Sequence, residues 1–407
     1  MLQNTENIIS RETFQSNRLQ SLSNGVCGAI EAMFAVTDLE ARPYQSRIIQ
    51  SAIQMFAGTK EECGSTLAPA SSVLIESPTG SGKTVMGLAA AALLQRMTGA
   101  RVGWVAMRRN LLAQAEAENR LRGFGLRMQT ISMFEKDPPE VDLLVVDEAQ
   151  HDAATSMANL HSKVRPTWTL GLSATPYRTD RIKLCFDQVI RDAGIASLIA
   201  DGYLSQYHHY TVPTHSPEFI ARLLVDCPEK WGKSLVFFHR RSECDDLQER
   251  LLGSGVSSEV VTATSDREKQ LDDFAAGRLD VLINMAILTE GFDCPELKTV
   301  FCRPSGKGCT IQMAGRVLRS CHRVPVKQVV QCRSTPHPML RTAMPTEQYL
   351  WTDDGWRSIH ANKRLDEMSQ AARRRIARAD VNLPNLVAMH RGRSKRQWQT
   401  SLENSNA

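Results

Sequence analysis

The sequence lacks long apolar runs and closely spaced cysteine pairs. It has no run of about eighteen apolar residues, and its first thirty residues contain no basic region followed by an apolar one, so neither a membrane span nor a secretory signal is indicated. We therefore expect a cytoplasmic protein with no membrane partner. None of the ten cysteines forms a CxxC pair, which favours reduced thiols. The spacing of Cys321, His322, Cys332 and His337 does not match a zinc knuckle or ribbon, so ordinary packing is favoured there.

The composition is typical of a soluble globular protein, with 42% hydrophobic and 23% charged residues. A length of 407 residues predicts two or three domains. The net charge of +5 is unevenly placed, because residues 360–407 contain ten Lys or Arg and only four Asp or Glu. This basic tail suits nucleic acid, and a solvated chain end explains it equally well.

A phosphate-binding loop is predicted between a buried strand at residues 73–75 and an Ala- and Leu-rich helix that runs to Leu94. Backbone N–H groups at such a junction point toward phosphates. Lys83 would reach the β- and γ-phosphates, and the Thr84 hydroxyl would bind Mg²⁺. The other loop residues expected to surround the phosphates are Pro78, Thr79, Gly80, Ser81 and Gly82. Ser77 occupies the first small position of the pattern, where glycine is usual.

A second buried strand at residues 141–146 leads directly into two carboxylates, Asp147 and Glu148. Such a pair is costly at a strand end unless a cation compensates it. We expect Asp147 to hold Mg²⁺ and Glu148 to position and deprotonate the attacking water. These residues predict a site that binds a triphosphate together with Mg²⁺.

Several weaker signals accompany this site. A helix is predicted from Pro43 to Met55, and Gln45 at its start can present an amide to an adenine edge. Arg108 and Arg109 follow a predicted strand at 101–106, where they could hold the phosphates of a polymer or simply face solvent.

Residues 218–335 are predicted to form a second parallel α/β unit, because strand and helix patterns alternate there. The expected strands are 234–238, 260–262, 281–284 and 299–302, and the expected helices are 241–252 and 266–274. A further helix carries Gln312, Arg316 and Arg319 at i, i+4 and i+7, which would aim all three side chains from one face at a triphosphate. A solvated basic stripe is the alternative.

With these residues in place, the chain resembles the superfamily 2 helicases, motors built from two RecA-like lobes. The matching blocks, in order, are RPYQ at 42–45, SPTGSGKT at 77–84, DEAQ at 147–150, SAT at 173–175, TEGFD at 289–293 and QMAGRVLR at 312–319. The runs at 171–180 and 291–295 look most like the bacterial and phage branch that includes RadD-like and restriction-type motor subunits.

The resemblance implies an α/β fold with two tandem RecA-like domains, parallel sheets flanked by helices, and a small C-terminal extension. The expected divisions are a helical N-terminal extension at 1–38, an ATP-binding domain at 39–206, a linker at 207–217, a second RecA-like domain at 218–335 and a basic extension at 336–407.

The resemblance also implies roles for individual residues. Lys83, Glu148, Gln312, Arg316 and Arg319 would be catalytic. Arg42 and Gln45, with Gly291 and Asp293 from the second lobe, would contact the nucleotide. Gln150, Ser173 and Thr175 would couple nucleotide state to lobe movement. The implied nucleic-acid contacts are Arg108, Arg109, Thr130, His239, Thr262 and Thr289.

The predicted function is that of an ATP-dependent helicase or translocase, acting on DNA more than on RNA, with a protein partner that could supply specificity. The alternatives are a duplex translocase that does not separate strands and a nucleotide-gated clamp on nucleic acid. Near the C-terminus, Asp353-Asp354-Gly355 predicts a hairpin turn flanked by Trp351 and Trp356. These tryptophans could stack on bases, although packing in a small core is the better-supported interpretation.

Overall fold

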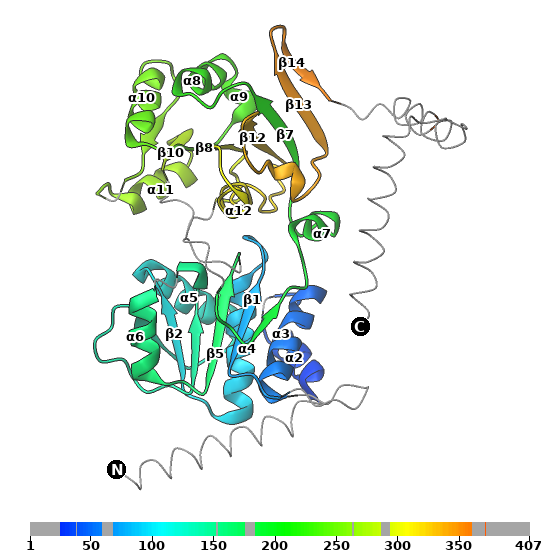
Figure 1. Cartoon of the computed structure of the whole chain (residues 1–407), viewed down its shortest axis with the longest axis vertical. Coiled ribbons are helices and arrows are strands. Elements are labelled where there is room, and N and C mark those ends of the chain that lie inside the picture. Colours follow the sequence, from blue (N-terminus) through cyan, green and yellow to red (C-terminus); the bar gives the residue numbers. More distant parts are fainter. Residues whose placement is uncertain are drawn as a thin grey trace, which may run out of the picture. The chain divides into compact units, whose positions relative to one another are not determined.

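The structure is a computed structural model that describes residues 25–37, 39–58, 68–151, 154–175, 184–262, 264–285, 294–359 and 371. Contacts divide the chain into a large unit, Met1–Ser358, and a small one, Ile359–Ala407. Among the described residues, no helix is both long and apolar enough to cross a membrane. Two parallel sheets dominate the large unit (Figure 1).

Six parallel strands of the described residues form the first sheet, in the order β3-β2-β4-β5-β1-β6. They are β1 (Ser72–Glu76), β2 (Val102–Ala106), β3 (Met128–Ser132), β4 (Leu143–Val146), β5 (Trp168–Ser173) and β6 (Gln188–Ile190). The central strands β2, β4 and β5 are buried along their whole length. Their continuous apolar sequence follows from this, since helices cover both faces of a parallel sheet.

The helices described around this sheet are α2 (Val26–Ala35), α3 (Pro43–Ala57), α4 (Lys83–Thr98), α5 (Arg109–Arg122), α6 (Ala154–Val164) and α7 (Ile195–Ala200), with a 3₁₀ turn η2 (Ala149–His151). Helix α4 leaves the phosphate loop and is buried around most of its circumference, which explains its run of alanines and leucines. Figure 1 shows α2 and α3 packed beside α4. Pro43 is the first residue of α3, as its fixed φ predicts.

The second sheet has the order β14-β13-β7-β12-β11-β8-β10-β9 among the described residues, and all its neighbouring strands are parallel except the hairpin pair. Its strands are β7 (Gln206–Val212), β8 (Ser234–Phe237), β9 (Ser258–Val260), β10 (Val281–Asn284), β11 (Thr299–Cys302), β12 (Val326–Cys332), β13 (Glu347–Thr352) and β14 (Gly355–Ser358). Its helices are α8 (Pro217–Asp226), α9 (Pro228–Trp231), α10 (Arg241–Leu251), α11 (Arg267–Ala275) and α12 (Lys307–Gly315), with a 3₁₀ turn η4 (Met339–Arg341).

The predicted linker at 207–217 is wrong in its first half, because β7 (Gln206–Val212) is an inner strand of the second sheet. It pairs with β12 on one side and β13 on the other. The linker prediction rests on the His and Pro residues of this stretch, and its adjacent histidines interrupt the apolar pattern expected of a buried strand. Tyr207 is fully buried, and His209 is buried with its Nε2 3.1 Å from Oε1 of Gln331. Tertiary packing therefore satisfies polar groups that, in the sequence alone, favour a loop.

The predicted hairpin at the end of the described chain is confirmed as β13 and β14, joined at Asp353-Asp354. Trp351 and Trp356 face each other edge-on with ring centroids 5.0 Å apart. Trp356 also packs 5.8 Å from Trp231, and Trp351 lies 5.3 Å from Phe219. Both tryptophans thus cover the core of the second sheet, which supports the packing interpretation over base stacking.

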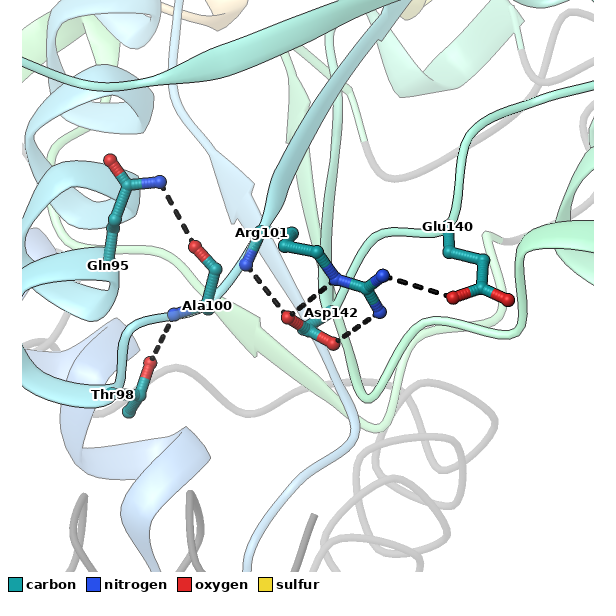
Figure 2. Close-up of polar contacts among 6 residues, drawn as sticks. All are labelled: Gln95, Thr98, Ala100, Arg101, Glu140 and Asp142. Carbon is teal, nitrogen blue, oxygen red and sulfur yellow. Dashed lines mark hydrogen bonds and ion pairs between the residues drawn. The ribbon is translucent and has the colours of Figure 1, made fainter. Parts of the chain in front are cut away.

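An ion pair fixes the amino-terminal ends of β2 and β4 (Figure 2). Asp142 accepts a hydrogen bond from the backbone N–H of Arg101 at 2.8 Å and contacts its guanidinium at 3.0 Å. The Asp142 side chain is 8% exposed, whereas that of Glu140, the other partner of Arg101, is 84% exposed. Asp142 also raises the pKa of Arg101 through this hydrogen bond. The pair lies at the opposite end of the strands from the phosphate loop and serves to hold their register.

We expect Asp142→Ala to lower the free energy of unfolding by about 2 kcal/mol, because the part-buried backbone N–H of Arg101 loses its acceptor and the Arg101 guanidinium loses the more buried of its two carboxylate partners. Glu140→Ala is the matched control and should cost no more than about 0.5 kcal/mol, since its contact is exposed to water. Urea denaturation followed by circular dichroism measures both. Equal losses of unfolding free energy in the two variants would contradict the proposal that Asp142 holds the register of β2 and β4.

Candidate nucleotide-binding site

The phosphate loop joins β1 to α4 and places Lys83 at the first turn of that helix. Gly82 caps the helix in the left-handed region at φ 81°, and a Cβ there would lie 2.6 Å from Nε2 of Gln45. Only glycine fits this position without strain or a clash. Lys83 is 8% exposed, and its Nζ lies 3.5 Å from the carbonyl oxygen of Pro78. The loop therefore holds a lysine ammonium in a buried setting at the amino end of a helix.

Ser77 explains why this loop tolerates the loss of the usual glycine. Its Oγ donates to Oγ of Ser81 at 2.7 Å, and Ser81 Oγ in turn lies 2.7 Å from the carbonyl oxygen of Pro78. The Ser77 backbone N–H donates to the carbonyl of Ser173 at 2.9 Å. The serine thus links the loop to itself and to the end of β5.

The start of α3 packs against the same loop. Gln45 Nε2 donates to the Ser81 carbonyl at 3.0 Å, and the Tyr44 hydroxyl donates to that oxygen at 2.6 Å. Gln45 Oε1 accepts from the Arg42 backbone N–H at 3.3 Å. Each end of the Gln45 amide retains capacity for one more hydrogen bond. Tyr44 is a site residue that the sequence analysis missed, although it lies inside the RPYQ block.

Asp147 and Glu148 follow β4, and both carboxylates interact electrostatically with the Lys83 ammonium. Burial, together with the Glu148 carboxylate, raises the pKa of Asp147 to about 7, and the Lys83 ammonium opposes that rise. Glu148 has φ 51°, which is rare outside glycine and carries a conformational cost. The backbone N–H of Glu148 donates to Asp147 Oδ1 at 2.9 Å, which helps to hold this geometry.

Gln150 connects Glu148 to the end of β5. Its Nε2 donates to Glu148 Oε2 at 2.6 Å, and its Oε1 lies 2.5 Å from Oγ of Ser173. A carboxylate can only accept, so this network fixes the orientation of the amide. Ser173 Oγ also accepts from the Thr175 backbone N–H at 3.1 Å. The three residues predicted to couple nucleotide state to movement thus form one connected set with Glu148.

Arg316 and Arg319 lie in the second half of the chain, and both guanidinium groups interact electrostatically with the Lys83 ammonium. Burial lowers the pKa of Lys83, Glu148 and Asp147 raise it, and the two arginines lower it. Burial lowers the pKa of Arg319 to about 10, and Glu148 opposes that shift. A Cβ on Gly315 would lie 3.1 Å from Cβ of Thr79, and one on Gly80 would lie 3.3 Å from Cγ of Arg319. The segment after α12 therefore lies directly against the phosphate loop.

The predicted single helical face for Gln312, Arg316 and Arg319 is wrong. Helix α12 ends at Gly315, Arg316 is its C-cap, and Arg319 lies beyond it in a bridge with Leu204. The backbone N–H of Ser205 donates to the Leu318 carbonyl at 2.8 Å. Pairing with this distant segment ends the helix, a tertiary effect that helix periodicity cannot show.

Most of the predicted nucleic-acid contacts lie where parallel strands end. Arg108 and Arg109 follow β2, His239 follows β8, and Thr262 follows β9. His239 Nδ1 lies 2.7 Å from Nη1 of Arg303, which follows β11. Ligands of parallel α/β sheets bind outside these carboxyl ends, so the positions are suitable for a ligand that crosses the sheet.

One predicted contact has a different setting. Thr130 lies inside β3 opposite Trp104, and its hydroxyl donates to Glu116 at 3.1 Å. Ser132, at the end of the same strand, is closer to the loop that carries Arg108. The Thr262 hydroxyl accepts from the backbone N–H groups of Thr264 and Ser265 and so shapes the turn before α11. Thr289, Gly291 and Asp293 lie outside the described residues.

The residues present fit a magnesium–triphosphate ligand. Within the described ranges, no group of three His, Cys, Asp or Glu side chains is placed to hold a metal ion by itself. Asp147 is a buried carboxylate with a raised pKa, a group that a divalent cation would compensate. Mg²⁺ characteristically takes one or two protein oxygens and completes its shell with phosphates and water. Asp147 and Thr84 match that pattern.

Two protein-family models match the chain on either side of β7. Residues 38–135 match the type III restriction enzyme res subunit, and residues 216–321 match the helicase conserved C-terminal domain. A 51.5 kDa protein of Lactococcus phage (isolate 7-9) is 24% identical over 286 residues, covering 61% of this chain and 63% of the relative. IRC3 of Saccharomyces cerevisiae, provisionally named an ATP-dependent helicase, is 26% identical over 227 residues, covering 46% of this chain and 33% of the relative. The chain therefore spans less than two thirds of the length of these relatives.

Solved structures share the fold at low sequence identity. A fragment provisionally assigned as an HsdR subunit of a type I restriction enzyme from Vibrio vulnificus YJ016 aligns with a TM-score of 0.57 and 17% identity, covering 80% of this chain and 72% of that one. A single-residue variant of Dbp5 from Saccharomyces cerevisiae, bound to RNA and ADP–BeF₃, aligns with a TM-score of 0.53 and 16% identity, covering 83% of this chain and 98% of that one. The two family matches make the chain similar to the superfamily 2 helicases, and the solved structures share its fold of two RecA-like domains.

We expect Gly82→Ala to lower the free energy of unfolding by about 3 kcal/mol and to weaken nucleotide binding, because the new Cβ is strained and meets Gln45. Gly99→Ala is the matched control. Gly99 caps the other end of α4 at φ 71°, and a Cβ there would have no atom within 4 Å. The Gly99→Ala variant should therefore lower the free energy of unfolding by about 1 kcal/mol and leave nucleotide binding unchanged. Thermal unfolding with and without a fluorescent ATP analogue measures both. Similar results for the two variants would contradict the proposed role of Gly82.

Proposed function

We propose that the protein is an ATP-dependent motor that moves on DNA and hydrolyses ATP at the site containing Lys83. The observation that best supports this is the gathering of Lys83, Asp147, Glu148, Arg316 and Arg319 into one electrostatically connected group. Lys83, Asp147 and Arg316 are buried, and Glu148 and Arg319 are half-buried. Three cations against two carboxylates leave an excess of positive charge. That excess suits a polyanionic triphosphate whose charge redistributes during phosphoryl transfer.

Each residue has a separate part in the proposed reaction. Lys83 binds the terminal phosphates, and Glu148 orients the attacking water and accepts its proton. Bound Mg²⁺, held through Thr84 and Asp147, neutralises charge on the phosphate oxygens. Arg316 and Arg319 stabilise the charge that develops in the transition state.

Movement on the polymer would depend on the hydrogen bonds that lead away from this site. Glu148 bonds Gln150, and Gln150 contacts Ser173. A change at the γ-phosphate would therefore alter the end of β5 through two hydrogen bonds. Arg108, Arg109, Thr130, His239, Thr262 and Thr289 are the proposed contacts to the nucleic-acid backbone, with Gly291 and Asp293 proposed as nucleotide contacts.

DNA is favoured over RNA as the track because the first half of the chain matches the restriction-enzyme res subunit model. A protein partner that supplies specificity is consistent with such subunits. The opposing proposal, a nucleotide-gated clamp that does not step, is less well supported, because a clamp has no need of both Glu148 and two arginines at the site.

We expect Lys83→Ala and Glu148→Gln each to lower DNA-stimulated ATP hydrolysis by at least about 100-fold, since one removes phosphate binding and the other the general base. Glu148→Gln should still bind ATP, whereas Lys83→Ala should not. Lys163→Ala on the exposed surface of α6 is the matched lysine control and should keep full activity. Phosphate release with single-stranded DNA measures the rates. Full activity in either site variant would refute the proposed site.

A second candidate function, translocation along duplex DNA without strand separation, is favoured by the same restriction-enzyme family match. Strand displacement on forked DNA and displacement of a triplex-forming strand from duplex DNA distinguish the two. We expect ATP-dependent triplex displacement in both cases, and strand separation only for a helicase. ATP turnover that is indifferent to DNA and RNA would favour the clamp instead.

A further inference from the structure

Tyr203 lies at the passage from the first sheet to the second, between α7 and β7. Its backbone N–H donates to the Leu198 carbonyl at 2.8 Å, which fixes it against α7. Its ring centroid is 5.3 Å from that of Tyr44, and Cζ of Arg42 lies 5.1 Å from the Tyr203 ring centroid. Tyr203 is half-buried, so the contacts form at the surface of the site.

The two contacts of the Tyr203 ring are made with the segment that borders the proposed base-recognition residue, Gln45. Nη1 of Arg42 donates to the Tyr44 hydroxyl at 3.3 Å, and Tyr44 and Gln45 share the Ser81 carbonyl as acceptor. A guanidinium is planar and can stack on aromatic rings. With Tyr203 against it, the half-exposed Arg42 has a defined orientation beside Gln45, where a flat nucleobase would bind.

The next two residues attach to the arginine-bearing segment. Leu204 is buried and bridges to Arg319, and the Ser205 N–H donates to the Leu318 carbonyl at 2.8 Å. Ser205 Oγ donates to the carbonyl of Arg319 at 3.2 Å. Three consecutive residues span at most about 7 Å between their outer Cα atoms. The Arg42 stack and the Arg319 backbone are therefore tied to one short peptide.

We propose that Tyr203 is a positioning residue that orients Arg42 for recognition of the adenine base, and that Leu204 and Ser205 connect that recognition to the placement of Arg319. This inference rests on the proposed ATP hydrolysis. It makes nucleotide selectivity depend on a residue outside the helicase sequence blocks, about 160 residues from Gln45.

The experiment compares kcat/KM for ATP and CTP, with saturating single-stranded DNA, in the full chain. Tyr203→Ala should reduce the ATP-to-CTP ratio by about 3- to 10-fold, the range expected for loss of a cation–π contact. Tyr203→Phe keeps the ring and should retain the ratio. Arg42→Lys keeps the charge without the planar group and should reduce the ratio like Tyr203→Ala, a test that stands even if Tyr203→Ala does not fold.

The double variant Arg42→Ala with Tyr203→Ala should lose no more selectivity than Arg42→Ala alone, because the tyrosine acts through the arginine. A merely structural role would instead lower kcat/KM for both nucleotides equally. An unchanged ATP-to-CTP ratio in both Tyr203→Ala and Arg42→Lys, or a wild-type chain that does not prefer ATP, would overturn the inference. A wild-type chain with no DNA-stimulated hydrolysis would refute the proposed function itself, so the two failures are distinguishable.

Discussion

The burial of the Lys83 ammonium is the constraint on which the rest of the site depends. A buried cation is costly unless opposite charges compensate it, and Asp147 and Glu148 provide that compensation from the end of β4. Gly82 must be glycine for the chain to enter α4 at this point, and Ser77 holds the loop closed. The arginines that follow α12 then add positive charge, which the protein tolerates because a polyanion is the expected ligand.

The two ends of the first sheet have different tasks. At the amino-terminal ends of the strands, Arg101 and Asp142 bond backbone and side chain together and hold the register of β2 and β4. At the carboxyl ends, Glu148 adopts a costly backbone conformation, and Gln150 and Ser173 join it in a hydrogen-bond network. Strain at one end of a sheet is sustainable because the other end and the buried strands between them are well satisfied.

The second sheet is extended beyond β7 by the hairpin of β13 and β14, which places Tyr349 in a stack with Tyr210 at 4.7 Å. Lys230 lies over the rings of Tyr210, Trp231 and Trp356 at 4.6 to 4.9 Å. Pairing with β13 covers β7, which would otherwise form an edge of the sheet, and the aromatic and cationic contacts pack the hairpin against the core. The hairpin therefore contributes to the stability of the second sheet.

Local sequence determined the parts of this protein that local chemistry controls. The phosphate loop, the carboxylates after β4, the start of α3 at Pro43 and the hairpin turn all follow from residue types at fixed spacing, and the order of the blocks indicated the resemblance to helicases. Tertiary structure decided the rest. The polar side chains of β7, such as His209, do not predict a buried strand from sequence, and only neighbouring residues in the fold provide their hydrogen-bond partners. Helix α12 ends before Arg319 because Leu204 and Ser205 pair with that segment. The contact of Tyr203 with Arg42 likewise joins residues far apart in sequence, and no periodicity or motif encodes such a contact.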